Sequence, residues 1–148
     1  MKRILIVYHS DTGNTRQMAE LVKEGCHRVK GVPVDLQPAK NVDMHQAATS
    51  YAGYAFGSPD YFSYVAGELK MFFDKALRNE KFHGKPFVAF GSHGGGAKVL
   101  GVIQALAESC KFVKVADGVM CNGAPDGPGC EQKLTALGEA LAKAVAEG

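Results

Sequence analysis

The chain has 148 residues, which is about the length of one domain, and we treat residues 1–148 as a single domain. Hydrophobic residues make up 46% of the chain and charged residues 22%, which is typical of a folded globular protein and excludes disordered, collagen-like and coiled-coil chains. The 17 Lys and Arg residues against 15 Asp and Glu leave a net charge of +2. This charge is too small for the basic surface of a nucleic-acid-binding protein.

The sequence also argues against a membrane protein and against a metal site. Its longest apolar run, residues 4–8, is far shorter than the roughly 20 residues that span a bilayer, and it starts too early to be the core of a signal peptide. The four cysteines form no C-x-x-C pair, and the five histidines show no metal-ligand spacing. We therefore expect a soluble, cytoplasmic protein with no membrane, nucleic-acid or metal partner.

Short strand-like runs alternate along the chain with segments whose apolar residues recur at helical spacing. In chain order, the strand-like runs are 3–8, 32–36, 51–56, 86–90 and 112–120, and the helical segments are 14–29, 65–76, 99–110 and 134–145. This alternation predicts an α/β protein with a parallel sheet. The stretch 38–50 is short and polar, so we expect only a weak helix after the second strand.

The composition of the strands predicts their order in the sheet. The first, third and fourth runs are almost continuously apolar, which indicates central strands that are buried on both faces. Pro33 and Asp35 place the second strand at one edge, and Lys114 and Asp117 place the fifth at the other. With right-handed crossovers, the predicted doubly wound sheet has five strands in the order 2-1-3-4-5.

A ligand in such a sheet binds beyond the carboxyl ends of the strands, where the strand order reverses. The loop after the first strand, S-D-T-G-N-T at 10–15, leads directly into the first predicted helix. A helix N-terminus offers unpaired N–H groups and a partial positive charge, so this loop is suited to hold a phosphate without a lysine. The candidate residues are Ser10, Thr12, Gly13, Asn14 and Thr15. Simple capping of the helix is the alternative.

Three loops carry a resemblance to a known family. The pattern S/T-x-T-G-x-T at 10–15 resembles the FMN-phosphate loop of the flavodoxin family. The segment 57–74, GSPDYFSYVAGELKMFFD, resembles the loop and helix of flavodoxin-like NAD(P)H:quinone oxidoreductases of the tryptophan-repressor-binding-protein type. The segment 91–97, GSHGGGA, is similar both to that group and to the flavodoxin domains of oxygen-reducing diiron flavoproteins. The resemblance implies a flavodoxin-like fold, with helices on both faces of the sheet, and FMN as the cofactor.

The resemblance places the FMN phosphate on the first loop and the flavin ring on the other two. The residues expected at the ring are Ser58, Pro59, Asp60, Tyr61, Phe62, Ser63, Ser92, His93, Gly94, Gly95 and Gly96. The aromatic side chains of Tyr61, Phe62 and Tyr64 can form walls for the ring, and backbone groups can form hydrogen bonds to its pyrimidine edge. The alternatives are an aromatic rim for a partner protein and, for His93, an ordinary solvated side chain. Ser63 departs from the quinone oxidoreductase pattern, which has glycine there.

The sequence leaves several functions open. The protein either transfers electrons between partner proteins or uses NAD(P)H to reduce a quinone or a free flavin at its own FMN; a flavin-binding sensor is a weaker third interpretation. We favour the electron carrier, because 148 residues leave few to hold a nicotinamide over the flavin. A homodimer that completes such a pocket is a further possibility. No catalytic residue is assigned.

Other classes with a similar sheet lack their motifs here. Asp60 could imitate the phospho-acceptor of a receiver domain, but the acidic pair after the first strand and the lysine at the end of the fifth are missing. The chain has no G-x-x-x-x-G-K-[ST] motif, and no G-x-G-x-x-G follows the first strand.

Cys121 and Cys130 bracket a Gly/Pro-rich turn and could pair on oxidation. We expect them to be reduced, because disulfides are rare in the cytosol.

Overall fold

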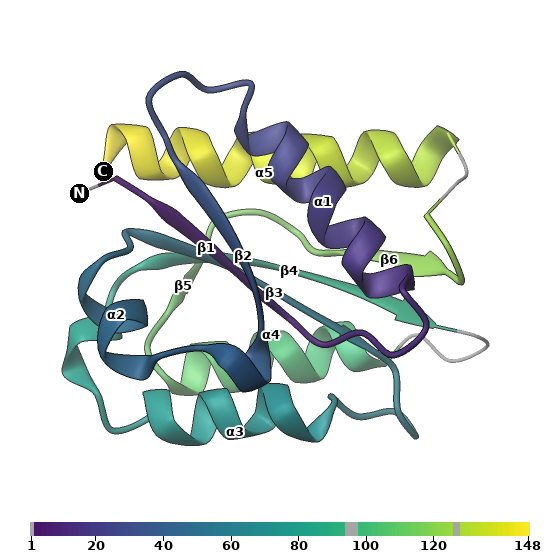
Figure 1. Ribbon diagram of the computed structural model, residues 1–148, viewed down its shortest axis with the longest axis horizontal. Coiled ribbons are helices and arrows are strands. Elements are labelled where there is room, and N and C mark those ends of the chain that lie inside the picture. Colours follow the sequence, from purple (N-terminus) through teal and green to yellow (C-terminus); the bar gives the residue numbers. More distant parts are fainter. Residues whose placement is uncertain (1, 94–97, 126–127) are drawn as a thin grey trace.

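A parallel sheet runs through the middle of the protein, and helices cover both of its faces (Figure 1). The computed structural model describes residues 2–93, 98–125 and 128–148. The strands are β1 (Ile4–Tyr8), β2 (Val34–Pro38), β3 (Gly53–Pro59), β4 (Pro86–His93), β5 (Val113–Lys114) and β6 (Val119–Asn122). Their order is β2-β1-β3-β4-β5, with β6 also paired to β4, so the predicted order is confirmed.

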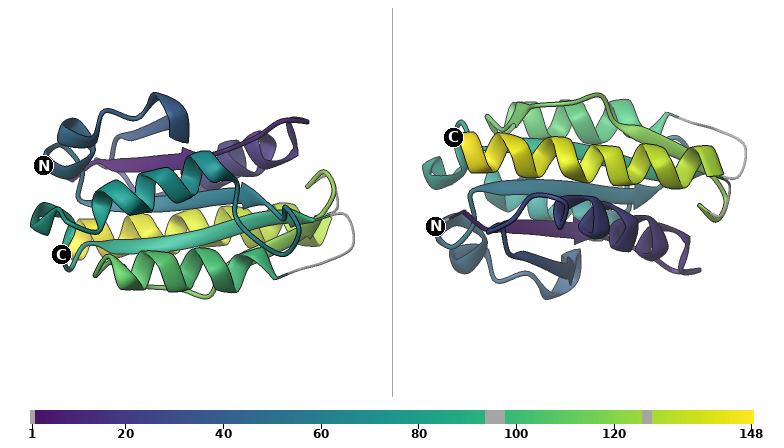
Figure 2. Two further views of the ribbon diagram at one scale, coloured as in Figure 1. Left: turned by 90° about the horizontal axis from the view of Figure 1, so that it is seen from below. Right: turned by 90° about the horizontal axis from the view of Figure 1, so that it is seen from above.

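The helices lie in two layers. They are α1 (Asn14–Cys26), α2 (Met44–Thr49), α3 (Gly67–Ala76), α4 (Val99–Ser109) and α5 (Pro128–Glu147), with the 3-10 turns η1 (Ala39–Asn41) and η2 (Glu80–Phe82). Helices α1 and α5 cover one face of the sheet, whereas α2, α3 and α4 cover the other, as the two views of Figure 2 also show. The predicted weak helix after the second strand corresponds to η1 and the short α2.

Strand β1 shows how one strand contributes to two cores. All five of its residues are buried. Leu5 and Val7 belong to the core under α3 and α4, and the alternate residues Ile4 and Ile6 belong to the core under α1 and α5. Successive side chains of a strand point to opposite faces, which explains why this run is apolar without a break.

Helices α1 and α5 approach each other closely at two glycines. A Cβ atom added to Gly25 would lie 1.9 Å from the backbone oxygen of Thr135, and one added to Gly138 would lie 1.9 Å from that of Val22. Only glycine fits at such contacts, so this spacing between the helices depends on both residues.

The fifth predicted strand, 112–120, is the part of the fold that the sequence analysis described incorrectly. The structure divides it into β5 and β6, so that the sheet has six strands. Four residues, 115–118, lie opposite only two residues of β4, Val88 and Ala89. The extra residues leave the pairing as a bulge, which a search for apolar alternation does not detect.

Candidate functional site

A cleft of about 200 Å³ lies at the carboxyl edge of the sheet, where the ends of β1, β3, β4 and β6 come together. Its walls come from the three loops that the sequence analysis selected and from the segment after β6. The lining residues are Asp11, Thr12, Asn14, Thr15, Pro59, Asp60, Tyr61, Ser92, His93 and Gly123.

The first loop presents the N-terminus of α1 without a cap. Gly13 precedes the helix with φ of 95°, a left-handed conformation that favours glycine, and its N–H donates to Ser10 Oγ at 3.1 Å. Among the described side chains, none caps the first turn of α1. The N–H groups of that turn therefore face the cleft beside Thr12 and Asn14, an arrangement suited to an anion.

Thr15 joins this loop to the end of β4. Its side chain is 1% exposed, and its Oγ1 lies 3.0 Å from Ser92 Oγ, which is also buried. These two predicted site residues thus hold two walls of the cleft together.

The side chains of Ser58 and Asp60 bond to the chain itself. Ser58 is fully buried, donates to the Pro59 carbonyl and accepts from the Ala66 N–H. The Asp60 carboxylate accepts from the backbone N–H groups of Ser63 at 2.6 Å, Lys98 at 3.0 Å and Val99 at 3.1 Å, so it caps α4 from a distant loop. These side chains therefore hold the loop in place, and the Asp60 N–H also donates to the Ser92 carbonyl at 2.8 Å.

A tight turn carries the aromatic residues. Tyr61 and Tyr64 exchange two backbone hydrogen bonds of 2.9 Å, and the residues between them, Phe62 and Ser63, have φ of 54° and 66°. Positive φ at both central positions is the pattern of a type I′ turn, which is unusual without glycine or asparagine. The turn leaves the Phe62 side chain fully exposed and directs Tyr61 into the cleft.

His93 ends β4 and presents a buried polar atom. Its Nδ1 has no hydrogen-bond partner among the described residues, although it is shielded from solvent. A buried nitrogen of this kind is available for a hydrogen bond with a ligand. The predicted residues Gly94, Gly95 and Gly96 lie outside the described part of the chain.

Two residues that the sequence analysis did not select, His9 and Glu68, stand behind the first loop. His9 lies between Glu68 and Asp11, and Asp11 accepts a hydrogen bond from the Tyr61 hydroxyl. This hydrogen bond, followed by the effect of His9, lowers the pKa of Asp11. Burial, followed by the bond to Asp11, raises the pKa of Tyr61 to about 12. In the sequence, His9 lies directly between β1 and the loop at 10–15, and this position was the signal that could have marked it as a site residue.

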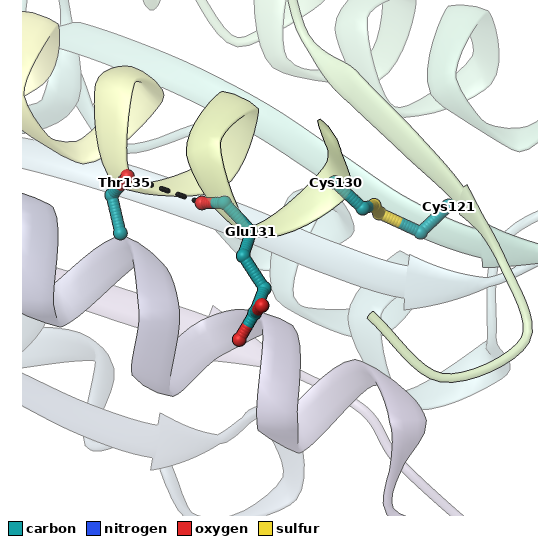
Figure 3. The surroundings of a disulfide bond; sticks show 4 residues. All are labelled: Cys121, Cys130, Glu131 and Thr135. Atoms are coloured by element: carbon teal, nitrogen blue, oxygen red, sulfur yellow. Dashed lines mark hydrogen bonds between the residues drawn. A yellow bond between two sulfur atoms is a disulfide. The ribbon is translucent and has the colours of Figure 1, made fainter. Parts of the chain in front are cut away.

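The predicted reduced state of Cys121 and Cys130 is wrong in this structure, which joins them in a disulfide beside the cleft (Figure 3). Cys121 pairs with Ser92 in the sheet, the chain turns at Gly123, and α5 brings Cys130 back. The two Cα atoms are 6.2 Å apart, within the range of disulfides. The expectation of reduced thiols rested on the compartment, whereas the proximity of the two cysteines is set by the fold.

The residues of the cleft fit a flavin mononucleotide. An uncapped helix N-terminus with hydroxyl and amide side chains suits a phosphate, while Tyr61, the unpaired His93 nitrogen and two loop backbones suit a flat heteroaromatic ring. Within the described ranges, no helix has both the length and the apolar character to cross a membrane.

Comparisons with known proteins agree with this geometry. A family model described as Flavodoxin matches residues 6–136. A flavodoxin from Aquifex aeolicus is 36% identical over 97 residues, which cover 64% of this chain and 52% of the relative. An NAD(P)H dehydrogenase (quinone) from Acidithiobacillus ferrooxidans is 35% identical over 94 residues, covering 51% of this chain and 47% of the relative. The chain thus spans about half the length of these relatives.

The solved structures confirm the fold. A flavodoxin from the domain Archaea has a TM-score of 0.89 at 24% identity, and the match covers 97% of this chain and 99% of that one.

Proposed function

The chain belongs to the flavodoxin family, whose cofactor is FMN, and we propose that it carries electrons between partner proteins through an FMN held in the cleft. When bound, FMN supplies a ring that accepts and returns electrons. The residues of the chain bind the cofactor, orient it and decide which molecules reach it.

The phosphate end of the proposed site is the first turn of α1. Its backbone N–H groups, together with Thr12 and Asn14, would donate to the phosphate oxygens. Ser10 is not among the described residues that line this cleft, and its Oγ accepts from the Gly13 N–H within the loop. Gly13 allows the backbone to approach closely, and the Thr15–Ser92 hydrogen bond fixes this loop against β4.

The ring end lies between the loop at 58–63 and the end of β4. Tyr61 would form an aromatic wall, and the backbone groups of both segments would bond the polar edge of the ring. His93 lines the cleft, and its Nδ1 is shielded from solvent without a hydrogen-bond partner among the described residues, so it is a further candidate to contact the ring.

The observation that favours a carrier is the exposed aromatic rim beside the cleft. Phe62 is fully exposed at the tip of its turn, and Tyr64 next to it is 44% exposed. Large apolar side chains held out into water at the mouth of a site are typical of contacts with another protein. We therefore propose that the redox partner docks over Phe62, close to the flavin.

The second candidate is an FMN-dependent NAD(P)H:quinone or flavin oxidoreductase. It is favoured by the loop sequences at 57–74 and by the relative named NAD(P)H dehydrogenase (quinone). A homodimer that completes a nicotinamide pocket across its interface belongs to this candidate, and sedimentation equilibrium of the FMN-loaded protein would reveal such a dimer.

Anaerobic stopped-flow spectroscopy separates the two candidates. Mixing the FMN-loaded protein with NADH or NADPH should leave the flavin absorbance unchanged for seconds. After chemical reduction, the protein should instead pass electrons rapidly to a haem protein such as cytochrome c, and Phe62→Ser should slow this transfer. Rapid bleaching by NADH or NADPH, followed by reoxidation with a quinone, would overturn the carrier.

The cytoplasmic location expected from the sequence stays a proposal, and the disulfide makes it worth testing, because disulfides are rare in the cytosol. Fractionation of cells with alkylation of free thiols would give both the compartment and the state of the two cysteines.

A further inference from the structure

A second cleft, of about 580 Å³, lies on the other side of the first loop. His9 lies in it, directly after β1, with its side chain 17% exposed. The charged groups around His9 come from four elements: Asp11 from the first loop, Glu68 from α3, Arg16 from α1 and Lys40 from η1.

Both ring nitrogens of His9 face carboxylates. Nδ1 lies 2.6 Å from Glu68 Oε1, and Nε2 lies 3.2 Å from Asp11 Oδ1. A neutral imidazole has one N–H and one lone pair, so it can donate to only one of the two ionised carboxylates. Donation to both requires the doubly protonated ring. A doubly protonated ring would thus form a clasp that joins α3 to the first loop.

The clasp reaches the cofactor cleft through Asp11. The second oxygen of this carboxylate accepts the hydrogen bond from the Tyr61 hydroxyl, and the Tyr61 and His9 rings pack edge to face with centroids 5.9 Å apart. Tyr61 is a wall of the first cleft. A continuous chain of contacts, Glu68–His9–Asp11–Tyr61, thus runs from α3 to the proposed flavin site.

We propose that His9 is a positioning residue that, in its doubly protonated form, holds Tyr61 against the cofactor through Asp11. This inference rests on the proposed FMN site. Of the groups in the chain, imidazole is the type that changes its charge between pH 5 and 8. The lowered pKa of Asp11 and the pKa of about 12 for Tyr61 keep those two groups in one form over this range. FMN affinity should therefore depend on the protonation of His9.

The test is the FMN affinity of the apoprotein between pH 5.5 and 9, measured by quenching of flavin fluorescence. His9→Gln should bind FMN about tenfold more weakly than the wild type at pH 5.5 and equally well at pH 9. Titration of the FMN phosphate affects both proteins alike, so the ratio of their affinities isolates the histidine. Glu68→Gln, which removes one side of the clasp, should lower the affinity at pH 5.5 by a smaller factor.

His83→Gln is the matched control, because His83 is exposed and precedes β4 at the opposite end of the sheet. The FMN affinity of this variant should depend on pH in the same way as that of the wild type. An affinity ratio between wild type and His9→Gln that stays constant with pH would show a merely structural role and overturn the proposal.

Nitrogen NMR of the apoprotein gives a readout that does not depend on FMN. The clasp predicts that both nitrogens of His9 are protonated at pH 6, and a single neutral tautomer there would contradict it. A wild-type protein that binds no FMN at any pH would contradict the proposed function instead, and the nitrogen spectrum would still decide the clasp.

Discussion

Replacing Asp60 with alanine should destabilise the protein even without a cofactor. The Asp60 carboxylate accepts from three backbone N–H groups, two at the start of α4 and one in the turn that carries Phe62. Loss of a helix cap costs about 1 to 2 kcal/mol, and loss of a further hydrogen bond costs about 1 kcal/mol. Asp60→Ala should therefore lower the free energy of unfolding by about 2 to 3 kcal/mol, or Tm by about 5 to 10 °C.

Urea unfolding of the apoprotein, followed by circular dichroism, measures this loss. Asp117→Ala is the control, because the Asp117 side chain is fully exposed and its ion pair with Lys114 is long, at 3.8 Å. Its stability should stay within about 0.5 kcal/mol of the wild type. If Asp60→Ala unfolds with the same midpoint as the control and loses only FMN affinity, then Asp60 is a ligand-binding residue and the structural argument is wrong.

Four further predictions concern the cofactor, the core, the disulfide and acid stability. Thr12→Ala should weaken FMN binding about tenfold by calorimetry, since it removes one hydrogen bond to a charged phosphate; an unchanged affinity would contradict the phosphate site. Gly138→Ala should cost about 2 kcal/mol or more of unfolding free energy because its Cβ would meet α1, whereas Gly101→Ala, with open space at that position in α4, should gain about 0.5 to 1 kcal/mol; equal effects in urea unfolding would refute this. Reducing the disulfide should lower stability by about 2 to 3 kcal/mol, as expected for a separation of nine residues, and the Cys121→Ser variant should then be insensitive to reductant. Burial raises the pKa of the Asp35 carboxyl, but hydrogen bonds from its tyrosine and arginine neighbours outweigh this effect and hold the pKa below its ordinary value. The ionised carboxylate therefore stabilises the folded protein above about pH 4, and this stabilisation is lost as the pH falls through the lowered pKa. Between pH 4 and 2, Tm should fall less in Asp35→Asn than in the wild type.

The strand order followed from composition because burial leaves a direct trace in the sequence. The unbroken apolar run at Ile4–Tyr8 and the charge at Asp35 separate a central strand from an edge strand. The division of the last strand left no such trace, because a bulge is a matter of register between two strands. Its detection required the partner residues on β4.

The site was predictable in its loops and less so in its side chains. The segment 10–15 predicted a helix N-terminus that could hold an anion, with simple capping as the alternative, because hydroxyl and amide side chains next to glycine are a local pattern. Asp60, by contrast, bonds residues nearly forty positions away, and His9 meets Glu68 from another element. Such contacts between distant segments are set by the fold, so a single sequence could not show them. The pairing of Cys121 and Cys130 was recognised as possible from the sequence, but the expected cytosolic compartment led to the prediction of reduced thiols.

Titration of the apoprotein with FMN and with riboflavin tests the central claim most directly. The two ligands share the ring and the ribityl chain and differ only in the phosphate, which the first turn of α1 is proposed to hold. Several hydrogen bonds to a charged group, at about 1.5 to 3 kcal/mol each, predict that FMN binds at least about 100-fold more tightly than riboflavin. Equal affinities, or no binding of FMN, would contradict the account.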